Sequence, residues 1–284
     1  MADPAYTVTT MAPADLDQAI AWAAAEGWNP GLGDRDSFYT ADPNGFLMGV
    51  LAGEPIASLS VVKYSDTFGF LGFYIVRPDW RGRGYGFQLW RAGLEYLAGC
   101  TIGLDGVVAQ QANYVKSGFQ LAYRNVRYAA MAAGQPDGSE TEVVPLTSLP
   151  FETVQRYDRR HFPSDRAAFL RAWITQPGST AIGILQGDRL AGYGVIRPCR
   201  QGFKIGPLFA DDGEVAERLF LHLRAQVPPG AAFYLDVPEV NGAAVALAQR
   251  QGMAVSFETA RMYRGPAPDL PLDEIFGVTS FELG

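Results

Sequence analysis

The chain has 284 residues, of which 48% are apolar and 19% are charged, and it carries a formal net charge of -7. This composition is typical of a folded globular protein, and the length exceeds the roughly 100–200 residues of a single domain. The acidic balance argues against nucleic-acid binding, which needs clustered Lys and Arg, and no apolar run approaches the roughly 20 residues that cross a bilayer.

The first half of the chain alternates strand-like and helix-like segments. A strand at 6–10 precedes a helix in which Leu16, Ala19, Ile20 and Ala23 share one face at helical spacing. Three strand-like runs then form an antiparallel meander, and a helix, a strand and a second helix follow. We predict these elements, in chain order, as strands at 46–51, 56–64 and 68–76, a helix from about 87, a strand at 101–104, and a helix near 108–116 that ends at Gly118.

The second half repeats this order, from a strand at 141–144 and a helix at 149–160 onward. Gly, Pro and Asp cluster between Ala133 and Ser139, which predicts a boundary between domains at 1–133 and 140–284. The matching positions are Asp42–Gly45 with Gln176–Gly178, Gly53–Glu54 with Gly187–Asp188, Gly69–Gly72 with Gly202–Gly206, Leu104–Asp105 with Leu235–Asp236, Gly118–Phe119 with Gly252–Met253, and Arg127–Tyr128 with Met262–Tyr263.

A glycine-rich turn between 77 and 86 is the most informative segment. A strand runs into glycines at alternate positions, and the turn then opens a helix. Glycines let a ligand approach the backbone, and the first turn of a helix presents unpaired N–H groups to an anion. Arg81 and Arg83 add positive charge, so the segment predicts a pyrophosphate site. The spacing matches neither the Rossmann loop nor the P-loop, and the alternative is a tight turn without a ligand.

The segment resembles the signature of the GNAT (GCN5-related) N-acetyltransferases, because Val76-Arg77-Pro78 leads to Arg81-x-x-Gly84-x-Gly86. The resemblance covers most of residues 6–128. It implies an α+β fold of two tandem GNAT-like domains, each a mixed, mainly antiparallel sheet flanked by helices, as in a subgroup with a second GNAT-like C-terminal domain. It also implies that acetyl-CoA is the co-substrate, bound by Ile75, Val76, Arg81, Gly82, Arg83, Gly84, Tyr85 and Gly86.

Two residues are candidates for moving protons. Tyr114 stands four residues before Gly118–Phe119, where family members often place a tyrosine that protonates the departing thiolate. Its alternative role is packing. Asp105 ends a predicted strand and is a candidate base or, alternatively, a helix cap. The preceding strand has no carboxylate where many GNATs carry Glu, and Val107 replaces the usual Asn, for which Gln110, Gln111 or Asn113 could substitute.

Other candidates carry weaker signals. His161, His222, Cys100 and Cys199 stand in no metal-ligand spacing, so we expect no metal, and surface or core positions for both histidines. A nucleophilic Cys199 is a weak hypothesis because no His is paired with it. An aromatic set could line a cation-binding or apolar pocket, with half of it in the core, and comprises Trp22, Trp28, Phe38, Tyr39, Phe70, Phe73 and Tyr74.

The second half has lost the glycine turn. Its counterpart, Ala210–Glu214, has one glycine and three carboxylates, which would repel a pyrophosphate. We therefore predict that this half binds no coenzyme and shapes or covers the acceptor site. Asp236 and Glu239 are candidates for meeting an amine there, or are solvated loop residues.

These patterns together favour an N-acetyltransferase that acts on a primary amine of a small molecule. The alternatives are an acyl-CoA-binding sensor or scaffold without catalysis, and an enzyme that acetylates protein amino groups. Residues 1–4 do not start a signal peptide, so we expect a cytoplasmic protein with neither nucleic-acid nor membrane partners. Nothing in the sequence indicates the oligomeric state.

Overall fold

The computed structural model describes residues 5–133 and 143–284, so most of the predicted boundary and the start of the predicted strand at 141–144 lie outside the described residues. The first half contains β1 (Tyr6–Thr10), α1 (Pro13–Ala25), α2 (Asp34–Ala41), β2 (Phe46–Leu51), β3 (Glu54–Lys63), β4 (Phe68–Val76), α3 (Tyr85–Tyr96), β5 (Thr101–Val107), α4 (Gln111–Lys116) and β6 (Gln120–Met131).

The second half follows the same order of elements, which confirms the predicted repeat. It contains β7 (Val143–Pro145), α5 (Phe151–His161), α6 (Ala167–Ile174), β8 (Thr180–Gln186), β9 (Arg189–Pro198), β10 (Phe203–Ala210), α7 (Gly213–Arg224), β11 (Ala232–Pro238), α8 (Gly242–Arg250), β12 (Ala254–Arg264) and β13 (Ile275–Gly277). No helix in the described parts of the chain is long and apolar enough to span a membrane.

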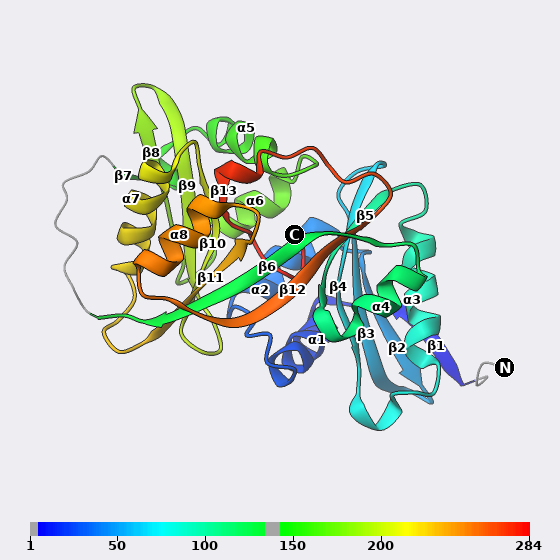
Figure 1. Ribbon diagram of the computed structural model, residues 1–284. Helices are drawn as coiled ribbons and strands as arrows, with labels where there is room; N and C mark the ends of the chain where they lie inside the picture. The colour runs from blue at the N-terminus through cyan, green and yellow to red at the C-terminus, as the bar shows by residue number, and fades with distance from the viewer. Residues whose placement is uncertain (1–4, 134–142) are drawn as a thin grey trace.

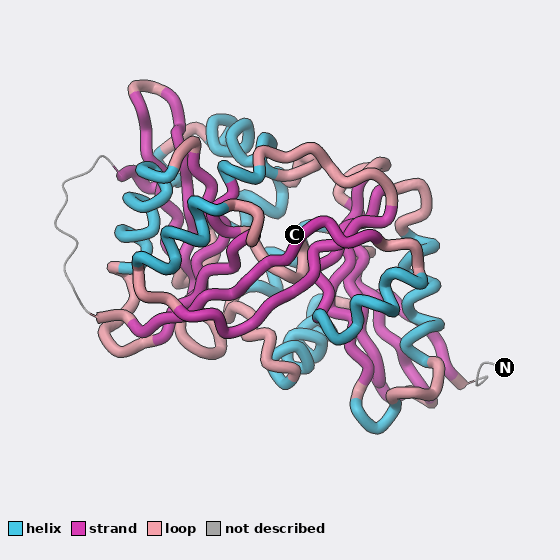
Figure 2. Tube along the Cα trace, viewed as in Figure 1, coloured by secondary structure: helices cyan, strands magenta, loops and turns pink. Residues whose placement is uncertain are grey.

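The strands of both halves join in one sheet. Its order is β1-β2-β3-β4-β5-β12-β6-β11-β10-β9-β8-β7, and β13 pairs with β10 beside this path. The two long strands β6 and β12 run side by side across the middle of the molecule (Figure 1). Strands therefore continue from one half into the other, with helices on both sides (Figure 2).

β12 lies between β5 and β6, so each half gives its last long strand to the other half's sheet. In this exchange Asp105 faces Arg261 across β5 and β12, and Asp236 faces Arg127 across β11 and β6. Arg127 is thus the counterpart of Arg261. The predicted match of Arg127–Tyr128 with Met262–Tyr263 is wrong by one residue.

The hydrophobic core is also shared between the halves. Its largest cluster takes residues from both, including Phe38 and Phe73 from the first half and Trp173 and Phe281 from the second. Phe38 stacks on Trp173 with ring centroids 5.9 Å apart, which joins α2 to α6. Since one cluster of buried residues draws on both halves, the two halves are packed as a single unit.

Candidate active site

The cavity begins where β4 and β5 separate. Their parallel pairing runs from Phe68 with Thr101 to Leu71 with Leu104, and it stops there. Phe73 has a φ of 47°, which a non-glycine residue rarely adopts, and the register with β3 slips at this point. This bulge turns β4 away from β5 and leaves the edge of β4 beyond Leu71 facing the gap.

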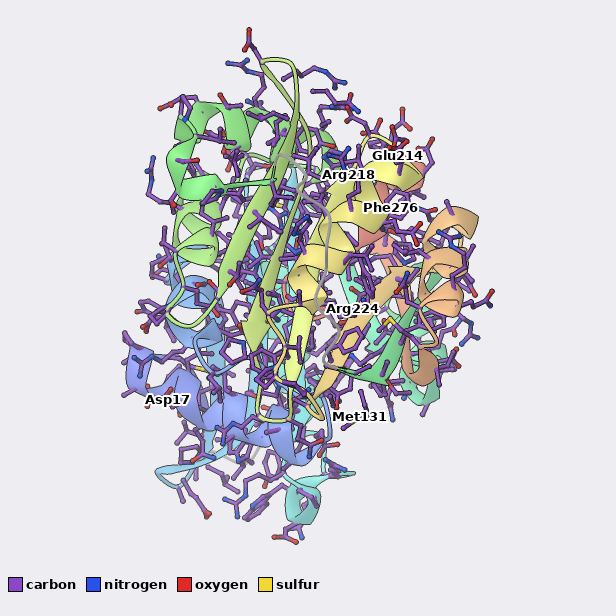
Figure 3. The ribbon with its side chains drawn as sticks, turned by 90° about the vertical axis from the view of Figure 1, so that its left-hand side faces the viewer. Asp17, Met131, Glu214, Arg218, Arg224 and Phe276 are labelled. Carbon is purple, nitrogen blue, oxygen red and sulfur yellow. The ribbon has the colours of Figure 1, made fainter. Side chains whose placement is uncertain are left out.

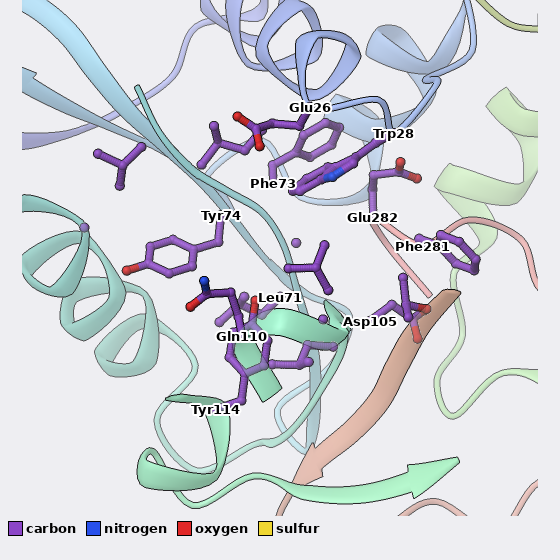
Figure 4. A pocket seen from close by; sticks show the side chains of 18 of the residues that line it. Glu26, Trp28, Leu71, Phe73, Tyr74, Asp105, Gln110, Tyr114, Phe281 and Glu282 are labelled. Atoms are coloured by element: carbon purple, nitrogen blue, oxygen red, sulfur yellow. The ribbon is translucent and has the colours of Figure 1, made fainter. Parts of the chain in front are cut away.

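A cavity of about 540 Å³ occupies this gap. Tyr74, Gln110 and Tyr114 lie on one side of it, and Phe281 and Glu282 of the second half lie on the other (Figure 4). Both halves supply walls, and the lining residues are Glu26, Trp28, Leu71, Gly72, Phe73, Tyr74, Ile75, Val76, Trp80, Arg81, Gly82, Gly84, Gly86, Phe87, Leu104, Asp105, Gly106, Val107, Gln110, Tyr114, Phe257, Thr259, Phe281 and Glu282.

The glycine turn lies at one end of the cavity. Gly82 and Gly84 have φ values of 74° and 86°, and a Cβ at either position would meet no atom within 4 Å. The residue before α3 is Gly84, which has no side chain that could cap the first turn of the helix. Gly86 differs, because a Cβ there would lie 2.7 Å from Val76 and 2.8 Å from the Tyr74 hydroxyl. The turn therefore offers space and donors to an anionic group.

The side chains predicted to bind the coenzyme divide into two sets. Ile75, Val76 and Arg81 line the cavity, where Arg81 pairs with Glu26 and its Nε donates to the Val76 carbonyl at 2.8 Å. Arg83 and Tyr85 are not among the lining residues. The Arg83 guanidinium lies over the Trp80 ring at 4.9 Å, and the buried Tyr85 ring packs on Tyr6 at 5.0 Å. The side chains of these two residues thus lie outside the cavity lining, and their part in coenzyme binding stays a prediction.

Tyr114 lines the cavity and is 8% exposed. Its ring stacks on Trp90 with centroids 5.6 Å apart, and a Cβ at Gly106 would collide with it, so the ring is held between α3 and β5. Burial raises the pKa of Tyr114 to about 12. The phenol therefore keeps its proton at neutral pH, as a proton donor must.

Asp105 also reaches the cavity, but its carboxylate is engaged. Arg261 donates from Nε at 2.9 Å and from Nη2 at 2.6 Å, and the Asn125 amide donates at 2.8 Å. Both oxygens of this carboxylate are thus occupied, with three hydrogen bonds between them. The side chain predicted as a base is thus a link between the halves.

The remaining predictions are only partly met at the cavity. Gln110 is the one polar candidate near α4 that lines it, while Asn113 donates to the Gln110 oxygen at 2.7 Å. Of the aromatic set, Trp28, Phe73 and Tyr74 line the cavity. Phe38 and Phe70 do not line it and are fully buried in the protein core. The cavity lining also leaves out His161, His222, Cys199 and Glu239.

Asp236 does not meet the cavity either. It is buried, and Arg127 donates to its two oxygens at 2.7 Å each. The prediction that Asp236 and Glu239 approach an amine in this cavity is therefore wrong, because Glu239 accepts a hydrogen bond from the Arg124 backbone outside it. The acid that the second half does bring to the cavity is Glu282, in a segment with no helical or strand periodicity to mark it.

Comparison with known proteins agrees with this geometry. A family model described as acetyltransferase (GNAT) family matches residues 14–119, and one described as acetyltransferase (GNAT) domain matches residues 154–277. Holothin acyltransferase of Pseudoalteromonas sp. (strain SANK 73390) is 34% identical over 281 residues, which are 97% of this chain and 94% of that protein. The chain belongs to the GNAT acyltransferases.

Solved structures share the tandem GNAT fold. One is a Pyrococcus horikoshii structure, itself named only as an inferred acetyltransferase, with a TM-score of 0.84 at 24% identity. The match covers 100% of this chain and 98% of that chain. The tandem GNAT protein from the clavulanic acid biosynthesis pathway has a TM-score of 0.62 at 15% identity, with 93% and 100% covered. The enzyme is thus an acyltransferase built from two GNAT domains.

The second GNAT domain has filled the places that are open in the first. The Asp212 carboxylate accepts from the N–H groups of Glu214 and Val215 at 2.9 Å, so it caps α7 where α3 has no cap. Glu214 and Arg224 mark the two ends of α7 (Figure 3). β10 and β11 pair only as far as Ile205, and β13 occupies the edge of β10 beyond it. A side chain and a strand thus occupy the places that correspond to the glycine turn and the free edge of β4 in the first domain.

Proposed function

We propose that this GNAT enzyme transfers an acetyl group from acetyl-CoA to a primary amine of a small molecule. The observation that carries the proposal is the continuity of one cavity. It joins the glycine turn at the start of α3 to Tyr114 and to a chamber with walls from both halves. An acyl donor and an acceptor could therefore meet within this one cavity.

The donor would lie along β4. The start of α3, which no side chain caps, and the open space at Gly82 and Gly84 suit the diphosphate of a coenzyme. The edge of β4 from Gly72 to Val76 is no longer paired with β5, so its backbone groups can pair with the amide groups of a pantetheine arm. This path ends near Tyr114, which has a proton for the departing sulfur.

The acceptor would enter the chamber from the side of the second half. Trp28, Phe257 and Phe281 give this chamber aromatic walls, and Thr259 gives it a hydroxyl. The name of the 34% identical relative gives holothin as its acceptor, which supports an acceptor of the same kind here. Since two of the aromatic walls come from the second half, that domain would shape the acceptor site.

The test is the release of free CoA from acetyl-CoA in the presence of primary amines, with holothin among them, and mass spectrometry of the products. We expect amine-dependent release and a product heavier by one acetyl group. If the protein binds acetyl-CoA but acylates no amine, it is a sensor and the proposal is wrong. Faster acylation of peptide or protein amino groups than of small amines would also contradict it.

A further inference from the structure

The segment after β13 carries a second-half side chain into the first half's cavity. The Val278 N–H donates to the Asp236 carbonyl at 2.9 Å, and the Tyr64 hydroxyl donates to the Leu283 carbonyl at 3.0 Å. Between these two anchors, the Glu282 backbone packs on Gly72 so closely that a Cβ at Gly72 would collide with its carbonyl oxygen. Gly72 is the first residue of β4 beyond the last pair with β5. Glu282 is therefore fixed at the point where the cavity opens.

The Glu282 carboxylate is buried without a hydrogen-bonding partner. The residue is 2% exposed and lines the cavity, and neither Oε1 nor Oε2 accepts a hydrogen bond from any residue that the structure describes. A buried carboxylate without partners is costly, and native proteins keep few of them. A group retained in this state points to a function that needs its lone pairs.

Charged groups surround Glu282, but they are engaged elsewhere. Lys204 on β10, Arg127 on β6 and Arg197 on β9 favour its anion, and Asp34 on α2 opposes it. Burial outweighs these effects and raises the pKa of Glu282. Each neighbouring cation has another partner: Arg127 binds Asp236, Arg197 binds Asp34, and Lys204 donates to the Asn29 carbonyl at 3.1 Å. Glu282 is thus no neighbour's primary counter-ion.

Three carboxylates line the cavity, and two of them are paired. Glu26 binds Arg81 at the glycine turn, and Asp105 binds Arg261 and Asn125. We propose that Glu282 is the catalytic residue that removes the proton from the acceptor amine, an inference that rests on the proposed function.

The step balances with the groups in place. The amine nitrogen forms a bond to the thioester carbonyl carbon, and the carbon–sulfur bond breaks. The proton from nitrogen passes to the Glu282 carboxylate, and Tyr114 gives its proton to the sulfur. The base comes from the second half and the acid from the first, so catalysis needs both domains.

The experiment compares E282Q with the wild-type enzyme and with E258Q. Glu258 lies on β12 between the cavity residues Phe257 and Thr259, is half-exposed, and pairs with Arg124 outside the cavity. With an amine that the wild-type enzyme acylates, we expect E282Q to lower kcat by roughly 10²-fold or more, whereas calorimetry shows unchanged acetyl-CoA affinity. E258Q should keep the wild-type rate.

The dependence of rate on pH gives a second readout. In the wild-type enzyme kcat/KM should fall at acidic pH as Glu282 gains a proton, and E282Q should lose this limb. E282D should recover part of the rate, because it restores a carboxylate. An active wild-type enzyme whose E282Q variant keeps its rate and its acidic limb would overturn this inference alone. A wild-type enzyme that acylates no amine would overturn the proposed function, and this inference with it.

Discussion

Arg261 holds Asp105 through two hydrogen bonds of 2.9 and 2.6 Å, although the two residues belong to different halves of the chain. Arg127 and Asp236 form the reciprocal pair. Both pairs are buried. One joins β5 of the first half to β12 of the second, and the other joins β11 of the second half to β6 of the first. The two domains are thus locked together by the residues at the centre of the exchange.

Removing one partner of such a pair should weaken the whole protein. Asp105→Asn leaves the Arg261 charge buried and uncompensated, and we expect it to lower the free energy of unfolding by about 3–5 kcal/mol. The control Glu258→Gln breaks a half-exposed pair and should cost less than about 1 kcal/mol. Urea unfolding measures both values, and equal values for the two variants would contradict the structural role of Asp105.

A carboxylate in the glycine turn should abolish coenzyme binding. Gly84→Asp places a negative charge at the start of α3, much as Asp212 does at the start of α7. The charge would occupy the donors that a diphosphate needs. We expect calorimetry to detect no binding of acetyl-CoA while circular dichroism remains native, and an unchanged affinity would show that the site lies elsewhere.

Loss of the Tyr114 hydroxyl should slow the reaction without weakening donor binding. Tyr114→Phe keeps the ring stacked on Trp90 but removes the proton donor. We expect kcat to drop by roughly 10²-fold, with little change in acetyl-CoA affinity. Tyr234→Phe, on β11 and away from the cavity lining, is the matched control. If both variants keep the wild-type kcat, Tyr114 serves in packing only.

The chain should bind a single coenzyme. Asp212 already accepts from the donors at the start of α7, and β13 covers the edge of β10 where a pantetheine arm would pair. Titration with acetyl-CoA should give a stoichiometry of about one per chain, since the glycine turn before α3 carries no such side-chain cap. Two equivalent sites would refute the asymmetry between the domains.

Glu282 should destabilise the folded protein when it is ionised. Its pKa is raised above the ordinary 4.5, so this group favours folding below that value and loses this contribution as pH rises through the folded pKa. The amide side chain that Glu282→Gln introduces cannot ionise. We expect the variant to have a higher Tm than the wild-type protein at about pH 8 and a similar Tm at about pH 4. A lower Tm of the variant at the higher pH would identify Glu282 as a structural counter-ion instead.

Contiguous features could be predicted from the sequence. The turn from Arg81 to Gly86 and the position of Tyr114 follow from local spacing, because the backbone and helix geometry of a few neighbouring residues create them. The order of strands and helices in both halves follows from local patterns as well, so the α+β repeat was predictable.

Pairing between distant segments was not predictable. β12 has the pattern of a strand, but nothing in that pattern indicates whether it pairs with β5 or stays in its own half. The buried pair of Asp105 could not be predicted for the same reason, since its partner Arg261 arrives through the exchange. The position of Glu282 in the cavity was also not predictable. The segment after β13 is irregular, and it reaches the cavity only because the other domain lies beside it.

The exchange of strands also determines when the molecule can be completed during synthesis. Proteins made of independent domains generally fold the N-terminal one first, while the rest is still being translated. Here β5 ends at Val107, whereas its neighbour β12 begins only at Ala254. Until then the nascent first half has an open strand edge, which other chains could join. The native pairing of β5 must therefore wait until β12 has been synthesised, about 150 residues later, and the open edge needs protection in the meantime.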